Sequence, residues 1–228
     1  MKELIELNKK IIACEKCPRL ITHCKEIAKN KKREFLRDTY WGKPVPGFGD
    51  PNAEVWVIGL APAAHGANRT GRMFTGDSSG RWLYRALYET GFSSSAISEK
   101  VKDGLKLKRI YISAAARCAP PDNKPTVEEL AQCSSFLDEE LQILNRVSVY
   151  LVLGKIAFDT TIKFLERQKV EIPKPKPKFS HGAFFQFEKV SVLCSYHPSR
   201  QNTQTGKLTE KMWLDIFIRL RKILDSKK

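Results

Sequence analysis

The sequence predicts an α/β protein of three layers, in which helices cover both faces of a central, mostly parallel four-stranded sheet. Four short segments are rich in β-branched and other apolar residues, and amphipathic helical patterns separate them along the chain. Alternating strands and helices are typical of a parallel sheet in an α/β/α sandwich. The 228 residues, 42% of them hydrophobic, suit one sizeable core, so we expect a single domain over residues 1–228.

The predicted elements follow one another in a regular order. Strands are expected at 54–59, 109–113, 147–153 and 190–195, and helices at about 78–90, from 126 onward, at 155–167 and at 207–224. The second helix begins at a capping box, Thr126-x-x-Glu129, and the last carries an apolar stripe. Ligand sites in such sheets lie beyond the carboxyl ends of strands, which here are the segments 60–77, 114–125 and 196–205.

The chain is strongly basic. Forty Lys and Arg residues stand against 25 Asp and Glu, which gives a formal charge of +15. This charge favours a polyanionic partner such as nucleic acid, although a solvated lysine-rich surface would give the same count. The N-terminus has no signal-peptide pattern, and no apolar run is long enough to span a membrane. We therefore expect a cytoplasmic monomer that does not bind membranes.

Four cysteines form two widely separated pairs, Cys14-x2-Cys17 and Cys118-x14-Cys133. Two thiolates at Cys-x2-Cys spacing can share a metal or cluster, and the second pair can complete the coordination. By periodicity alone Cys133 is a core residue of its helix, and Cys24 and Cys194 compete as ligands. The spacing suits zinc as well as an iron–sulfur cluster. Either would join the segment 1–37 to the rest of the domain.

The segment after the first strand is rich in glycine and small residues, which let a backbone approach a ligand closely. It reads Gly59-Leu-Ala-Pro-Ala-Ala-His-Gly66 and continues to Arg72-Met-Phe-Thr-Gly-Asp77. A phosphate-binding P-loop would need Lys where Asp77 stands, and the glycine spacing of dinucleotide-binding folds is absent. A second segment, Tyr196-His-Pro-Ser-Arg200, places His197 just beyond a strand.

Together these motifs resemble the uracil-DNA glycosylases, and specifically family 5, the UDGb-type branch. The two segments above and the order of the four cysteines carry the resemblance from Cys14 to about Thr205. It implies a repair enzyme that flips uracil, and other deaminated bases such as hypoxanthine, out of DNA and hydrolyses the N-glycosidic bond. It also implies a structural [4Fe–4S] cluster, with ligands Cys14, Cys17, Cys118 and Cys133.

The resemblance gives Asp77 and His197 the catalytic roles. Cleavage of the N-glycosidic bond builds positive charge on the sugar and negative charge on the departing base. A carboxylate can position water and stabilise the cation, which suits Asp77, and a donor at the base oxygen suits His197. Each residue also has a simpler explanation: Asp77 as the N-cap of the next helix, and His197 as a buried turn histidine.

The remaining site residues follow from the same motifs. The base pocket is expected to include Phe74 as the stacking face, although Phe74 alone could equally be core packing. Its other expected members are Gly59, Leu60, Ala61, Pro62, Ala63, His65 and Ala114. Contacts to DNA are expected from Arg69, Arg72, Ser199, Arg200, Gln201 and Asn202.

Ala114 departs from the pattern of related glycosylases. It stands where they commonly carry an Asn that reads the edge of uracil, and Ala63 also replaces a polar residue of related branches. A pocket poor in polar groups discriminates weakly between bases. We therefore expect broader base tolerance, or slower uracil removal, than in relatives with that Asn.

Two other functions remain possible on the sequence. A non-catalytic nucleic-acid-binding module with a structural zinc or iron–sulfur site would have the same charge and cysteines, and Ala114 lends it some support. A phosphate-ester enzyme is disfavoured because the chain shows no paired carboxylates placed to bind metal ions.

Overall fold

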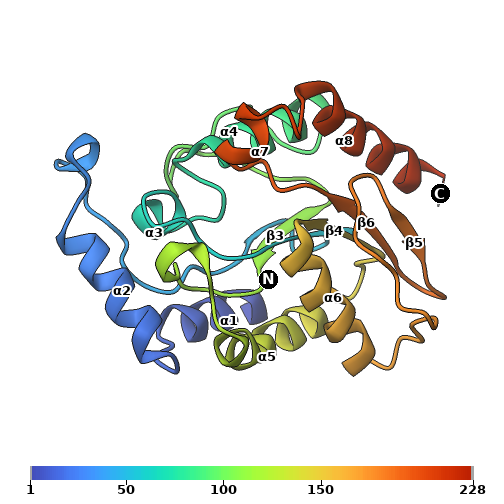
Figure 1. Ribbon diagram of the computed structural model, residues 1–228, viewed down its shortest axis with the longest axis horizontal. Coiled ribbons are helices and arrows are strands. Elements are labelled where there is room, and N and C mark those ends of the chain that lie inside the picture. The colour runs from blue at the N-terminus through green and yellow to red at the C-terminus, as the bar shows by residue number, and fades with distance from the viewer. Residues whose placement is uncertain (1, 227–228) are drawn as a thin grey trace.

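A six-stranded sheet forms the middle layer of the molecule (Figure 1). The structure is a computed structural model that describes residues 2–226, so residues 1, 227 and 228 of the predicted domain lie outside the described residues. The inner strands are β3 (Ile110–Ala114), β2 (Val55–Gly59), β4 (Val149–Leu153) and β6 (Ser191–Ser195), in this spatial order and all parallel. These are the four strands that the sequence predicts.

Two short antiparallel strands complete the sheet at its edges. They are β1 (Phe48–Gly49), which pairs with β3, and β5 (Phe184–Gln186), which pairs with β6. The predicted count of four strands was therefore too low. These strands have only two and three residues, none of them buried, so they lack the continuous apolar run that identifies a central strand.

Helices cover both faces of the sheet, which confirms the predicted layers (Figure 1). The helices α4 (Ser78–Glu89), α7 (Arg200–Gln204) and α8 (Glu210–Asp225) lie on one side, and α1 (Lys2–Ile12), α5 (Val127–Ile143) and α6 (Lys155–Arg167) on the other. The capping box between Thr126 and Glu129 starts α5 as predicted. None of the helices in residues 2–226 has the length and apolar character that crossing a bilayer would require.

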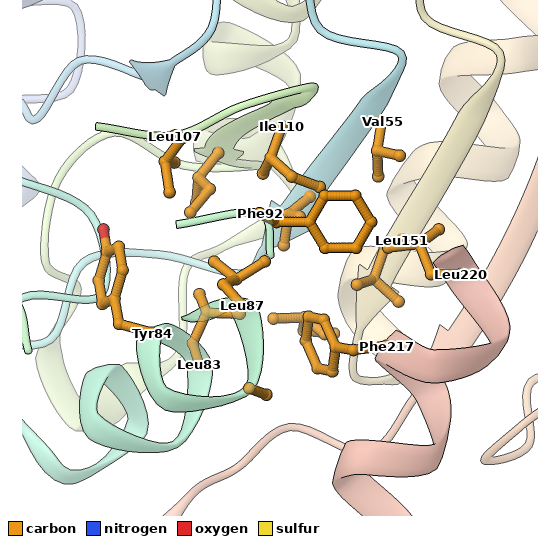
Figure 2. Close-up of a cluster of buried hydrophobic side chains, with 14 of the residues drawn as sticks. Val55, Leu83, Tyr84, Leu87, Phe92, Leu107, Ile110, Leu151, Phe217 and Leu220 are labelled. Atoms are coloured by element: carbon orange, nitrogen blue, oxygen red, sulfur yellow. The ribbon is translucent and has the colours of Figure 1, made fainter. Parts of the chain in front are cut away.

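Each face of the sheet has its own core because alternate strand residues point to opposite sides. Val55 and Leu151 pack with residues of α4 and α8, among them Leu87 and Phe217 (Figure 2). Trp56, Tyr150 and Val152 point the other way and pack against α5 and α6. The two cores hold the inner strands rigidly, so the loops at their carboxyl ends have a firm base.

Two N-terminal helices lie beside this sandwich. Helix α1 packs on α5 through Leu7 and Ile11 against Phe136. Helix α2 (Pro18–Lys29) packs Leu20 and Cys24 against Cys118 and Ala119, which follow β3. Two ion pairs supplement these contacts: an exposed one between Lys10 and Glu139 at 2.8 Å, and a partly buried one between Arg19 and Glu129 at 2.7 Å.

The strand order reverses between β2 and β4. From β2 the chain adds β3 on one side and then β4 on the other. In an open parallel sheet, ligands bind outside the carboxyl ends of the strands at such a reversal. The segments that follow β2, β4 and β6 meet there.

Candidate active site

A cavity of 740 Å³ lies at the carboxyl ends of the parallel strands. Segments that follow all four inner strands line it, including Leu153–Ala157 after β4, which the sequence analysis did not single out. Eleven predicted site residues meet in its wall: Leu60, Ala61, Pro62, Ala63, His65, Phe74, Asp77, His197, Ser199, Arg200 and Gln201.

Asp77 is both the N-cap of α4 and a residue of the cavity wall. Its Oδ1 accepts a hydrogen bond from the Gly80 N–H at 2.8 Å, which is the geometry of a helix cap. Burial raises the pKa of this carboxyl, against the opposing effect of the Gly80 N–H and of Arg81. The capping role and the position facing the cavity therefore coexist in one side chain.

Two glycines without side chains allow the backbone to approach the Asp77 carboxylate and the Phe74 ring closely. A Cβ on Gly66 would lie 2.3 Å from Asp77 Oδ2, and one on Gly59 would lie 2.9 Å from the Phe74 ring. No side chain fits at such distances without moving its neighbour. Gly59 thus supports the pocket from behind, because it backs the Phe74 ring without lining the cavity.

Phe74 adopts a backbone conformation that is unusual for an aromatic residue. Its φ is +53°, in the left-handed region, where a bulky side chain costs about 1–3 kcal/mol. The neighbouring chain holds it there: Tyr84 donates a hydrogen bond to the Met73 carbonyl at 2.9 Å, and Gly80 packs directly against the Phe74 carbonyl. The strain presents the ring to the cavity, opposite the His197 ring at 5.8 Å between centroids.

His197 is held through the backbone of its own turn. The Asn202 side-chain amide donates to the His197 carbonyl at 2.8 Å, and the Ser79 hydroxyl donates to the Pro198 carbonyl at 3.0 Å. Burial lowers the pKa of His197 to about 4. The imidazole is therefore neutral at pH 7 and can offer an N–H without carrying charge.

His65 occupies a different part of the wall. Its Nδ1 is hydrogen-bonded to the Tyr40 hydroxyl at 2.9 Å, and its ring packs against Tyr40 and Phe35. Burial lowers its pKa, as do the nearby charges of Lys32 and Arg69. His65 is a neutral residue of the pocket rim.

Besides Gly59, four predicted site residues do not line the cavity, and three of them form hydrogen bonds within the protein instead. Ala114 is 1% exposed and does not line the cavity; it ends β3, beside its register partner Gly59 on β2. Arg72 is 2% exposed and is tied to Asp103 and Ser98, which leaves no free guanidinium for DNA. Arg69 bonds to Asp38 and to the carbonyls of His65 and Gly76, and Asn202 braces the His197 turn.

The cavity also contains residues that the sequence analysis missed. Asn123 and Asp122 lie at its rim after β3, both with left-handed φ values of 57° and 53°. Asn and Asp adopt this conformation more readily than other non-glycine residues. The turn-forming run Pro120-Pro-Asp-Asn123 was a visible signal, but nothing in it indicates which way the Asn123 amide points. Lys32, Arg81 and Lys155 add positive charge to the rim.

The structure brings the four predicted cysteine ligands into one region beneath the N-terminal helices. The pKa of Cys17 is raised by burial and by the charges of Cys133 and Cys14. The pKa of Cys118 is raised by its hydrogen bond with Cys24, by burial and by Cys133 and Cys14. Cys14 and Cys133 thus lie within electrostatic reach of each other and of both Cys17 and Cys118, although 104 residues separate Cys14 from Cys118 in the chain.

The competing cysteines have different surroundings. Cys24 lies beside Cys118 and donates a weak hydrogen bond to the Ala119 carbonyl at 3.6 Å. Cys194 lies on β6 in the apolar core between the sheet and α6, away from this region. Within residues 2–226, no three or more His, Cys, Asp or Glu side chains are grouped as ligands of a metal ion.

Known proteins resemble this chain over most of its length. The profile of the uracil DNA glycosylase superfamily matches residues 46–221. A type-5 uracil-DNA glycosylase of Thermus thermophilus is 46% identical over 214 residues, 93% of this chain and 94% of the relative. That of Mycobacterium bovis is 43% identical over 96% of this chain and 81% of the relative. That of Pyrobaculum aerophilum is 41% identical over 92% of this chain and 88% of the relative.

A type-4 uracil-DNA glycosylase of Archaeoglobus fulgidus is more distant, at 26% identity over 87% of this chain and 83% of the relative. The difference in identity separates the two types clearly. The superfamily profile covers all four inner strands and the segments that follow them, including Asp77 and His197. The chain therefore belongs to the uracil-DNA glycosylase superfamily, and within it to the type-5 branch.

Proposed function

We propose that this protein is a DNA repair enzyme that excises uracil by hydrolysing the N-glycosidic bond, leaving an abasic site. The observation that carries the proposal is the cavity itself, in which a partly buried carboxylate, a neutral histidine and an aromatic ring share one wall. The relatives that cover most of the chain are named for the same activity.

Asp77 serves the sugar side of the reaction. As the bond breaks, the sugar acquires oxocarbenium character and needs a nearby anion and a positioned water. The cap bond from Gly80 orients the carboxylate, and burial strengthens its electrostatic interaction with a developing cation. Asp77 accepts a proton from the attacking water more readily than an exposed aspartate, because its pKa is raised.

His197 serves the departing base. A neutral imidazole N–H can donate to the base oxygen as negative charge develops there, without a proton transfer that its lowered pKa would disfavour. Backbone N–H groups of Leu60, Ala61 and Ala63 lie in the same wall and can add further donors, whereas Pro62 has none. The base leaves as a stabilised anion.

Base recognition rests on Phe74 and Asn123. The Phe74 ring offers a stacking face to a flipped base, and the Asn123 amide at the rim can pair with its edge. Ala63 lines the wall where related branches carry a polar residue, so we expect the pocket to tolerate hypoxanthine as well as uracil. Excision of the two bases from otherwise identical duplexes tests this, and strict uracil specificity would contradict it.

DNA follows the basic rim of the cavity. Arg200 and Gln201 stand exposed on α7, and Lys32, Arg81 and Lys155 lie around the same opening. Phosphate contacts from these residues set the position of the duplex but not its sequence. The enzyme works as a monomer, because one chain contains the complete wall.

The four cysteines hold a [4Fe–4S] cluster with a structural role. Cys14 and Cys17 come from the turn between α1 and α2, while Cys118 and Cys133 come from the segment after β3 and from α5. Four converging thiols from these elements form the donor set of such a cluster, which when bound ties the N-terminal helices to the sheet. Iron and sulfide analysis with a visible absorption spectrum tests the assignment.

The activity has a direct test. The purified protein is incubated with a duplex that contains one uracil, and alkali then cleaves any abasic site. We expect cleavage at the uracil position and none in a thymine control. A non-catalytic binding module would retain the duplex in a gel-shift assay while leaving the uracil in place, and this result would refute the proposal.

A further inference from the structure

Arg117 is a fully buried cation with more hydrogen-bond donors than the surrounding protein uses. It lies between β3 and Cys118 and is 1% exposed. One terminal nitrogen, Nη2, donates to Glu140 Oε2. Among the described residues, Nε and Nη1 are buried without a hydrogen-bond partner. A buried donor left unpaired costs about 1–3 kcal/mol, so these two N–H groups call for an acceptor.

Glu140 cannot supply that acceptor alone. Its Oε1 accepts the Tyr111 hydroxyl at 3.1 Å, and its Oε2 accepts the Ser113 hydroxyl at 3.0 Å in addition to Arg117 Nη2. Trp56 extends the network by donating to the Ser113 hydroxyl at 2.8 Å. The carboxylate is therefore already shared among three donors.

Two of the predicted cluster ligands, Cys118 and Cys133, lie close to Arg117. The backbone N–H of Arg117 is hydrogen-bonded to the thiol of Cys133, and the Arg117 and Cys133 charges each act on the other group. Cys133 and Glu140 are seven residues apart on α5, two turns along the same buried face. Cys118 is the next residue in the chain. Arg117 is thus enclosed between Glu140 and two predicted cluster ligands.

We propose that Arg117 positions the [4Fe–4S] cluster by donating its Nε and Nη1 hydrogens to the cluster's sulfur atoms. This inference rests on the cluster assignment made above. Thiolate and sulfide sulfurs carry negative charge, accept N–H groups, and have reduction potentials that respond to such bonds and to burial. Glu140 holds the guanidinium in place through Nη2, so Arg117 acts on the cluster and takes no part in the excision reaction.

Two variants and one matched control separate this role from that of an ordinary buried ion pair. Arg117→Lys keeps a cation beside Glu140 but removes the forked donors. The double variant Arg117→Met, Glu140→Gln removes both charges together, which avoids leaving one buried charge uncompensated. Tyr111→Phe is the control, because it removes a bond to Glu140 from the same network without touching the Arg117 donors.

The readouts are the rate of iron loss to an added chelator and the reduction potential, measured on anaerobically purified protein of verified fold. We expect both Arg117 variants to lose iron about tenfold faster or more. Their potentials should shift to more negative values, because both variants lack the N–H donors that favour the reduced, more negative cluster. Tyr111→Phe should match the wild type in both measurements.

The outcomes distinguish the two proposals. If the wild type contains iron and sulfide but the folded Arg117 variants keep its potential and rate of iron loss, the donor role is wrong and the cluster assignment stands. If the wild type contains zinc or no metal, the cluster assignment fails and the donor role fails with it.

Discussion

Asp77 and Glu140 are both carboxylates with little access to solvent, and they differ in how their charge is compensated. Asp77 accepts the Gly80 N–H and, within residues 2–226, forms no ion pair. Glu140 is 0% exposed and accepts bonds from Arg117, Tyr111 and Ser113. The first lies in the wall of a cavity and has a raised pKa, whereas the second lies between a strand and a helix.

This difference suits Asp77 to a role in the reaction and Glu140 to a role in the stability of the fold. A carboxylate whose charge is poorly compensated gains most when a cation develops beside it, which is the requirement at the sugar. A carboxylate with all its oxygens bonded gains nothing from a substrate, but its removal leaves several buried donors without an acceptor. We therefore expect substitutions at the cavity to remove activity, and substitutions at the Arg117–Glu140 pair to remove stability.

Asp77→Asn should have the largest effect, a fall of about a thousandfold in the single-turnover rate of uracil excision. Asn caps helices as well as Asp does, so the free energy of unfolding should stay close to that of the wild type. Asp77→Ala should lose the same activity and also about 1 kcal/mol of stability through the missing cap. An excision rate within tenfold of the wild type in Asp77→Asn would leave Asp77 with the capping role only.

Glu140→Ala should show the opposite result, with a loss of about 3–5 kcal/mol in the free energy of unfolding measured in urea. The cause is the uncompensated Arg117 charge and the unpaired hydroxyls of Tyr111 and Ser113. Glu139→Ala is the matched control: its exposed pair with Lys10 should contribute about 1 kcal/mol or less. Equal stability losses in the two variants would contradict the contrast between the regions.

His197→Gln should lower the excision rate about a hundredfold while the protein stays folded at pH 7. It should also change how stability depends on pH. The unfolded chain protonates this histidine below its ordinary pKa of 6.5, whereas the folded protein does so only near 4. The contribution of His197 to stability is therefore present above pH 6.5 and is lost as the pH falls toward 4.

Between pH 7 and pH 5 this loss should reach about 2 kcal/mol in the wild type and be absent from His197→Gln. Asp77 acts in the opposite direction, because its raised pKa makes the folded state bind a proton more readily as the pH falls. Its effect is common to both proteins and cancels in the comparison. Urea unfolding at the two pH values measures the difference, and parallel pH profiles would show that His197 is not buried as a neutral group.

Gly66→Ala should reduce excision about tenfold or more, because the added Cβ would displace the Asp77 carboxylate from its position. Gly104→Ala is the control: its Cβ meets nothing within 4 Å, but its φ of +80° imposes backbone strain on any side chain. A loss of excision that is the same in both variants would point to a general loss of stability rather than to displacement of Asp77.

Arg200→Ala should have the smallest effect, a few-fold weaker binding of duplex DNA and a salt dependence reduced by about one phosphate contact. Arg72→Ala should instead destabilise the fold, because it leaves Asp103 without its buried partner, and should keep the salt dependence of the wild type. Titrations at several salt concentrations measure both variants. An unchanged salt dependence in Arg200→Ala would remove α7 from the proposed DNA path.

Local patterns in the sequence predicted much of the fold. The four inner strands, the capping box at Thr126 and the stripe of α8 each depend on residues within one segment, and all are confirmed. The short edge strands β1 and β5 carry no such pattern, because pairing with a neighbour rather than their own burial makes them strands. The resemblance to a glycosylase predicted that Asp77 and His197 belong to the site. Without it, the residues alone favoured a helix cap for Asp77 and a buried turn histidine for His197.

The sequence by itself determined the parallel sheet, the loops that carry the site and the four cysteines that can share a cofactor, because spacing, periodicity and capping are local properties of the chain. Only the tertiary structure decided which polar groups face the cavity. Ala114 turned out to lie outside the cavity wall and Asn123 at its rim, and Arg72 proved to be a buried partner of Asp103. The direction of a loop side chain depends on residues distant in the chain, so these placements appear only once the segments have packed together.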